Sequence, residues 1–240
     1  MTENLQAGVY LVPLPIGTDS PIHYHTPYLL DLIPKIKYWV AENARTLRRY
    51  ISSLKLGIDI DTLEIFESNQ HTAENELNAF LSKLEREVLL GVVSEAGIPC
   101  LADPGNRVVA WAHRKNIRVV PLIGPNSIAM ALESSGMNGQ QYIFHGYPPI
   151  QGLEQKKWLS ELFSGPWQKY THSFIETPYR TDKLYQSIIH SLPEYIQLCI
   201  ASNLHNPDQF IQTKSIGEWK KTNTKWGKVP AVWVLSKQTL

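Results

Sequence analysis

Residues 89–109, LLGVVSEAGIPCLADPGNRVV, decide the predicted fold. The apolar run 89–93 is typical of a buried strand, and a helical pattern begins after Gly105. The loop between them holds two glycines, which permit positive φ, and two prolines, which fix φ. Ligands bind at the carboxyl ends of strands in open α/β sheets. A plain connector is the alternative, but Glu95 and Asp103 within the loop favour a binding site.

Two further loops rich in glycine and proline follow predicted strands. Residues 13–17 end the first strand, which is expected at 8–14, and residues 123–127 follow an apolar run at 117–121. The second of these loops leads into a helix, whose free backbone N–H groups can accept a carboxylate or phosphate. If these two loops and the central loop, 95–105, lie at one sheet edge, they predict a small-molecule pocket.

The order of elements predicts an α/β protein of two domains. Five short strands alternating with helices indicate a mainly parallel sheet in residues 1–122. Closely spaced strands near the C-terminus indicate antiparallel pairing, and hence a mixed sheet, in residues 123–240. The other strands are expected at 38–40, 62–66, 142–144, 173–176, 197–201, 210–213 and 231–235, and the main helices at 28–33, 44–56, 72–86, 152–163 and 181–190.

The bulk composition is that of an ordinary soluble protein. The chain has 240 residues, a formal net charge of +1 and two cysteines, so neither a polyanion-binding molecule nor a disulfide framework is indicated. No apolar run is long enough to span a membrane, and the N-terminus does not resemble a signal peptide. We therefore predict a cytoplasmic protein. His23 and His25 lack further metal-ligating neighbours, so no metal site is predicted.

Two basic segments each allow a structural and a functional interpretation. Arg45, Arg48 and Arg49 lie on one predicted helix, either as a solvated face or as a phosphate-facing patch. Residues 214–228 carry five lysines and two tryptophans. They are either an exposed helix and turn, which we prefer, or an RNA-facing loop with stacking aromatic rings.

Six segments together resemble the tetrapyrrole methylase superfamily, and within it the small-subunit rRNA 2′-O-ribose methyltransferases. The segments are YLVPLPIG (10–17), AENAR (41–45), VSEAGIPCLADPG (93–105), IGPNSIAMALESSGM (123–137), FHGYPP (144–149) and IETPYR (175–180). The sequence departs from that branch at Glu42-Asn43-Ala44, where an acidic-Asp-Thr run is usual. It departs again at 202–206, where the usual charges of an Arg-Glu-Leu-Thr-Lys run are missing.

The resemblance implies a homodimer with two α/β domains and S-adenosylmethionine (AdoMet) in the cleft between them. AdoMet carries its own activated methyl group, so the protein mainly has to bind it, orient it and exclude water. The positions that match cofactor-binding residues of the family are Pro15, Gly97, Ile98, Pro99, Ala102, Asn126 and Ser127, with Glu176 and Leu204 as weaker candidates from the second domain.

The expected substrate is the ribose 2′-hydroxyl of 16S rRNA in the small ribosomal subunit. A hydroxyl is a poor nucleophile at neutral pH, so a group must orient it or accept its proton, and Glu42 and Glu95 are the acidic candidates. Arg45 and Arg180 are the candidates for RNA phosphate contacts. The alternatives are methylation of a tetrapyrrole or another small molecule, and a non-catalytic AdoMet-binding protein.

Overall fold

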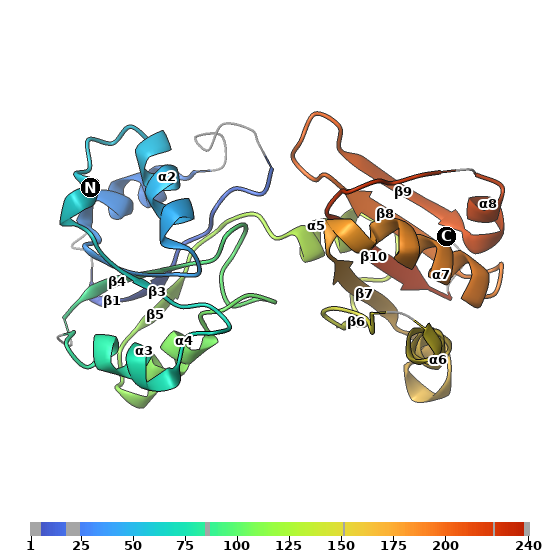
Figure 1. The fold of residues 1–240 in the computed structure, drawn as a ribbon, viewed down its shortest axis with the longest axis horizontal. Helices are drawn as coiled ribbons and strands as arrows, with labels where there is room; N and C mark the ends of the chain where they lie inside the picture. The colour runs from blue at the N-terminus through green and yellow to red at the C-terminus, as the bar shows by residue number, and fades with distance from the viewer. Residues whose placement is uncertain (1–5, 18–24, 85–86, 151, 223, 238–240) are drawn as a thin grey trace. The chain divides into compact units, whose positions relative to one another are not determined.

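A computed structural model describes residues 6–17, 25–84, 87–150, 152–222 and 224–237 (Figure 1). The chain divides into two compact units, Met1–Asn126 and Ser127–Leu240, and each is described by itself. The predicted domain boundary, between residues 122 and 123, lies just before this division. None of the described helices has the length and apolar character that crossing a bilayer requires.

The first unit is built on a parallel five-stranded sheet, as predicted. Its strands, in the spatial order β3-β2-β4-β1-β5, are β3 (Glu64–Glu67), β2 (Tyr38–Ala41), β4 (Leu89–Val93), β1 (Gly8–Leu11) and β5 (Val119–Pro121). The helices are α1 (Pro27–Leu32), α2 (Ala44–Ser53), α3 (Glu74–Leu81) and α4 (Asn106–Arg114), with 3₁₀ turns at Ile33–Lys35 and Ile60–Thr62. In Figure 1, α2 lies on one face of the sheet, and α3 and α4 lie on the other.

Because helices cover both faces, the central strands of this sheet are apolar on both sides. One core cluster contains Trp39 and Leu47 under α1 and α2, and the other contains Leu77 and Trp111 from α3 and α4. Trp39 is fully buried, and its indole N–H donates to the carbonyl of Ile36 at 3.0 Å. That hydrogen bond holds the indole ring in one position against the sheet.

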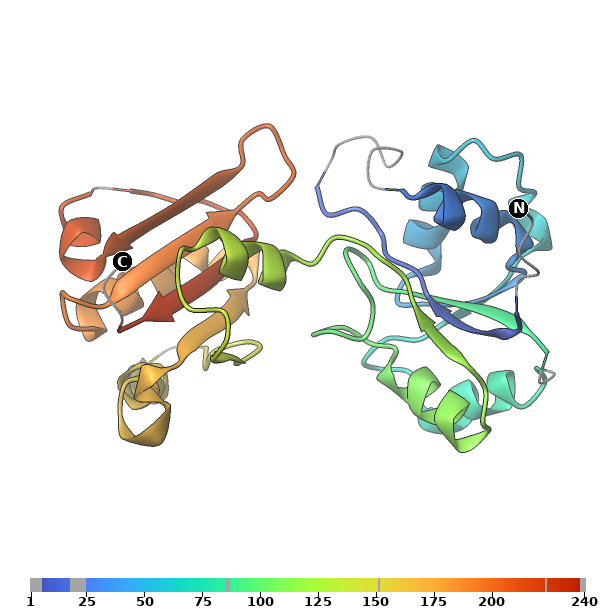
Figure 2. The ribbon, with the colours of Figure 1, turned by 180° about the vertical axis from the view of Figure 1, so that it is seen from behind.

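The second unit is built on a mixed five-stranded sheet, also as predicted. Its strands, in the order β6-β7-β10-β8-β9, are β6 (Tyr142–Phe144), β7 (Thr171–Glu176), β10 (Ala231–Ser236), β8 (Gln197–Ser202) and β9 (Phe210–Ser215). Only the pair β6–β7 is parallel. The helices are α5 (Ser127–Ser134), α6 (Gly152–Leu162), α7 (Thr181–Ser191) and α8 (Ile216–Lys220), with 3₁₀ turns at Gly165–Lys169 and Pro178–Arg180. Helix α7 lies on the face of this sheet that is turned toward the viewer in Figure 1. Helix α5 lies on the opposite face, which Figure 2 shows.

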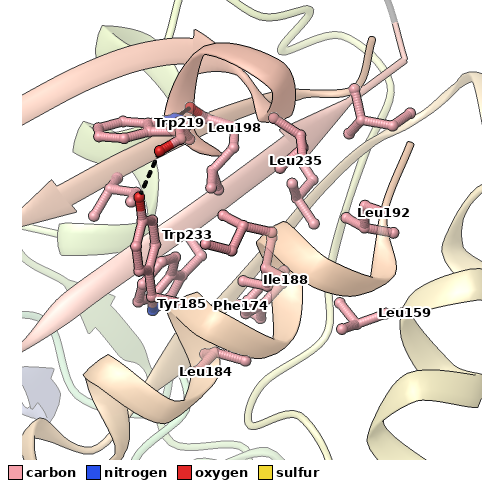
Figure 3. Close-up of a cluster of buried hydrophobic side chains, with 14 of the residues drawn as sticks. Leu159, Phe174, Leu184, Tyr185, Ile188, Leu192, Leu198, Trp219, Trp233 and Leu235 are labelled. Atoms are coloured by element: carbon pink, nitrogen blue, oxygen red, sulfur yellow. Dashed lines mark hydrogen bonds between the residues drawn. The ribbon is translucent and has the colours of Figure 1, made fainter. Parts of the chain in front are cut away.

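The core of the second unit contains the two tryptophans of the basic segment 214–228. Trp219 is 1% exposed, and its indole N–H donates to the Leu198 carbonyl at 2.9 Å. The Tyr185 hydroxyl in turn donates to the Trp219 carbonyl (Figure 3). Trp226 packs edge-on against the rings of Tyr185 and Phe210. Both rings pack against other side chains of this unit, which favours the structural interpretation over stacking on RNA bases, and the segment itself is only partly exposed.

Several predicted boundaries differ from the structure, among them three in the first unit. The helix expected at 44–56 ends at Ser53, and Lys55 then adopts a positive φ of 52°. Residues 60–62 form a 3₁₀ turn, capped by the Asp59 side chain, before a strand that begins only at Glu64. The helix expected at 72–86 is observed as Glu74–Leu81, and its predicted last residue lies outside the described ranges.

Candidate active site

Backbone hydrogen bonds join the three predicted loops. Leu14 and Gly97 form an antiparallel bridge in which each amide N–H donates to the other carbonyl at 2.9 Å. The next amide, that of Ile98, donates to the Pro125 carbonyl at 3.1 Å. The loops after β1, β4 and β5 therefore meet at the carboxyl edge of the first sheet, as the sequence predicts.

Two glycines allow this close approach. Gly97 has a φ of +68°, and a Cβ atom on it would lie 3.1 Å from the Pro125 carbonyl oxygen and 3.3 Å from Ile16 Cγ2. Gly124 packs so tightly against the ring of Pro13 that any Cβ atom there would overlap the ring carbons. Only glycine fits at these two positions without moving the neighbouring loop.

The central loop holds two residues in the left-handed region that L-residues rarely adopt. Cys100 has a φ of 70° and Ala102 a φ of 64°. Such conformations cost of the order of 1–3 kcal/mol each and are found most often at functional sites. Burial, and then the nearby Asp103 carboxylate, raise the pKa of the Cys100 thiol to about 11, so this cysteine is protonated at neutral pH and is not an activated nucleophile.

The predicted cofactor residues are distributed over both units. The first unit holds Pro15, Gly97, Ile98, Pro99, Ala102 and Asn126, all on the joined loops or next to them. The second unit holds Ser127, the first residue of α5, together with Glu176 and Leu204. Leu204 is buried, and it lies between Asn203 and His205, which both have a positive φ.

Three carboxylates gather beside the joined loops. The Glu95 amide donates to Glu42 Oε2 at 3.3 Å, and the Thr46 hydroxyl donates to Glu95 Oε1 at 3.3 Å. Burial raises the pKa of Glu42 and the charge of Asp103 raises it further, while the hydrogen bond from the Glu95 amide partly offsets the increase. Burial likewise raises the pKa of Asp103, with the charge of Glu95 adding to the effect. A carboxylate with a raised pKa is a stronger base than an ordinary one.

Local contacts at the start of α2 position this cluster. Asn43 caps the helix, since its side-chain oxygen accepts from the amides of Arg45 and Thr46 at 2.9 and 3.2 Å. The Glu67 carboxylate, at the end of β3, accepts from the Ala44 amide at 3.0 Å. Neither the sequence motifs nor the family resemblance marks Asn43, Thr46 or Glu67 as site residues. An asparagine just before a predicted helix is a capping signal, and this signal could have identified Asn43.

Glu176 and Arg180 form a buried ion pair in the second unit. Arg180 Nη2 lies 2.5 Å from Glu176 Oε1, and Arg180 Nε donates to the same oxygen at 2.8 Å. The Thr177 amide also donates to it, while the buried Oε2 has no partner among the described residues. The predicted cofactor ligand and the predicted phosphate contact thus bind each other, so Arg180 would have to leave a buried carboxylate to bind RNA.

We expect Arg180→Ala to lower the free energy of unfolding by about 3 kcal/mol, because it leaves the Glu176 carboxylate buried and uncompensated. Urea unfolding would measure the change. Lys157→Ala is the matched control, since Lys157 and Glu161 have the same sequence spacing but form an exposed pair at 3.8 Å, worth at most about 0.5 kcal/mol. A loss for Arg180→Ala no larger than that of the control would contradict this role.

Within the described ranges, no group of three or more His, Cys, Asp or Glu side chains is arranged to hold a metal ion. His25, one of the two histidines considered in the sequence, hydrogen-bonds to the Tyr50 hydroxyl, and His23 lies outside the described residues.

No protein-family model matches the chain, but similar curated proteins are found. The ribosomal RNA small subunit methyltransferase I of Vibrio cholerae is 27% identical over 210 residues, which cover 88% of this chain and 69% of that protein. The protein of the same name from Escherichia coli is 26% identical, over 90% of this chain and 72% of its own length. The protein of the same name from Micromonospora olivasterospora is 31% identical, over 72% of this chain and 51% of its own length.

Solved structures of methyltransferases share the fold. The methyltransferase CobJ matches with a TM-score of 0.62 and 13% identity, over 96% of this chain and 94% of its own. Uroporphyrin-III-C-methyltransferase from Thermus thermophilus matches with a TM-score of 0.55 and 16% identity, over 97% of this chain and 93% of its own. The chain is therefore a methyltransferase of the tetrapyrrole methylase fold, and its sequence is similar to that of the bacterial small-subunit rRNA methyltransferases I.

Proposed function

We propose that the protein uses AdoMet to methylate a ribose 2′-hydroxyl of 16S rRNA. The joined loops at the carboxyl edge of the first sheet carry this proposal, because the three segments that resemble AdoMet-binding motifs are the three that the backbone hydrogen bonds bring together. The similarity to rRNA methyltransferases over about nine tenths of the chain supports the choice of RNA over a tetrapyrrole.

The loop residues fit a cofactor that needs close backbone approach. Gly97 keeps its loop free of a side chain where it meets Pro125, and the left-handed conformation of Ala102 is of the kind found at binding sites. In this proposal the predicted residues Pro15, Ile98 and Pro99 line the same site. AdoMet supplies an activated methyl group when bound, and the residues around it exclude water and hold the methyl group toward its acceptor.

Glu42 is the proposed proton acceptor for the ribose hydroxyl. It is half-buried, and it lies beside the joined loops through its contact with the Glu95 amide. Its raised pKa makes it a stronger base than an exposed glutamate, although it still has to be deprotonated in order to act. Glu95, whose side chain accepts from Thr46, orients the Glu42 carboxylate through its backbone amide, and burial and the charge of Asp103 raise the pKa of Glu42.

We expect Glu42→Gln to lower the methylation rate by about 10²-fold or more and to leave AdoMet affinity unchanged, because general bases contribute on that scale. The wild-type rate should fall on acidification at a higher pH than an ordinary glutamate would give, since protonation of Glu42 removes the base. Single-turnover rates across a pH series measure both effects. Glu64→Gln, in an exposed ion pair with Lys37, is the control. An unchanged rate and pH profile in Glu42→Gln would exclude this role.

The homodimer implied by the family resemblance stays a prediction, as does the cytoplasmic location that rRNA methylation would require.

A further inference from the structure

A shallow groove of about 650 Å³ runs along α2 on the first unit. One wall is the exposed side of the helix, and the other is the 3₁₀ turn Ile60–Thr62, of which only the last residue lies in the strand expected at 62–66. Its lining residues are Arg45, Arg48, Arg49, Ser52, Ser53, Ile60 and Asp61.

The arrangement of the three arginines does not stabilise the helix that carries them. Arg45, Arg48 and Arg49 are spaced i, i+3 and i+4, so their like charges lie on one face and repel one another. Arg45 is in the first turn of α2, where the positive end of the helix dipole disfavours a cation. Their place in the helix therefore calls for a partner outside it.

No such partner is found in the part of the chain that the structure describes. Among those residues, no carboxylate lies within ion-pair distance of the three guanidinium groups, although all three side chains are exposed and Asp61 lines the same groove. Guanidinium groups bind phosphate through two parallel hydrogen bonds, which makes arginine the preferred residue for backbone phosphates. A shallow open groove suits a chain of phosphates.

We propose that this groove binds the phosphodiester backbone of the RNA substrate, an inference that rests on the proposed function. Arg45 and Arg49 are separated by about 6 Å along the helix axis, so their guanidinium groups can contact different phosphates of one strand. Thr46, next to Arg45, contacts Glu95 in the carboxylate cluster. The Arg45 end of the groove is therefore next to the carboxylate cluster that contains the proposed proton acceptor.

The test measures binding of a labelled single-stranded RNA, about 12 nucleotides long, by fluorescence anisotropy over a series of KCl concentrations. Arg48→Ala/Arg49→Ala should weaken binding at low salt by about tenfold or more. It should also reduce the slope of log K against log salt by about 1.4, since each lost single-strand phosphate contact removes about 0.7. Arg114→Ala/Lys115→Ala removes two exposed cations at the end of α4, on the other face of the sheet, and is the matched control.

A second variant gives the opposite change, which misfolding cannot imitate. Asp61 supplies the negative charge in the groove, and its carboxylate takes part in no ion pair or hydrogen bond among the described residues. Asp61→Asn should therefore tighten RNA binding about two- to threefold. Calorimetry with AdoMet on each variant should give the wild-type affinity, because none of these side chains lies on the joined loops.

The outcomes separate this inference from the proposed function. If wild type methylates RNA while the arginine pair and Asp61→Asn bind RNA as wild type does, the groove assignment is overturned and the proposed function stands. If wild type binds AdoMet but no RNA, and a polycarboxylate porphyrin gives a spectral shift that Arg48→Ala/Arg49→Ala removes, the groove binds carboxylates and the RNA substrate is wrong. If wild type binds no AdoMet, the proposed function itself fails.

Discussion

Gly97→Trp is expected to abolish AdoMet binding, with an affinity loss of at least about 100-fold. The indole would have to occupy space that the Pro125 carbonyl oxygen and Ile16 fill, only 3.1 and 3.3 Å from the first added carbon. The loops after β1 and β5 would then separate from the central loop, and the bridge between Gly97 and Leu14 would break. Calorimetric titration with AdoMet and with S-adenosylhomocysteine measures the loss directly.

A matched pair of alanine variants separates loop packing from backbone strain. Gly97→Ala adds the same first carbon at a φ of +68°, while Gly57→Ala adds it at a φ of +72° with no atom within 4 Å. Both carry the cost of an L-residue at positive φ, roughly 1 kcal/mol. We expect only Gly97→Ala to weaken AdoMet binding. Equal AdoMet affinities for these two variants would show that the contact between the loops does not shape the cofactor site.

Gly91→Ala is expected to lower the free energy of unfolding of the first unit by about 3 kcal/mol. Gly91 lies in the middle of β4 and is paired in register with Trp39 on β2. A Cβ atom at Gly91 would overlap carbons of the Trp39 ring, which is fully buried and is held by its hydrogen bond to Ile36. Overpacking of a core usually costs 1–3 kcal/mol, and a ring that cannot move puts this site at the upper end. Urea unfolding gives the value.

A double-mutant cycle tests the cause of that loss. Trp39→Leu alone should also destabilise the unit, because it leaves a cavity in the core. In Gly91→Ala/Trp39→Leu the added methyl group enters that cavity, so the double variant should lose clearly less stability than the two single losses combined. Strict additivity would mean that the indole ring is not what excludes a side chain at Gly91.

Local patterns predicted the parts of the molecule that depend on local rules. The alternation of apolar runs and helical segments gave the parallel first sheet and the mixed second sheet. Glycine and proline at the ends of β1, β4 and β5 predicted the loops that Leu14, Gly97 and Pro125 join. These predictions succeeded because turn geometry and burial are encoded in neighbouring residues.

The predictions that failed or stayed incomplete depend on tertiary contacts. Trp219 looks exposed among lysines, but α8 packs its ring on the second sheet. Arg180 pairs with Glu176 because the 3₁₀ turn at residues 178–180 folds the chain back after β7, and helical spacing rules do not describe that turn. The 3₁₀ turn at residues 60–62, the second wall of the arginine groove, was not predicted, because the local pattern indicates only a strand that begins at Thr62.

Methyl transfer to small-subunit rRNA measures the proposed activity itself. Purified protein, labelled AdoMet and small ribosomal subunits that lack the modification are incubated, and the rRNA is digested and mapped by mass. We expect one labelled nucleotide whose 2′-O-methyl group blocks alkaline cleavage of the adjacent bond, and no transfer by Gly97→Trp. A wild-type protein that binds neither AdoMet nor S-adenosylhomocysteine and transfers no label to the rRNA would contradict the proposed function.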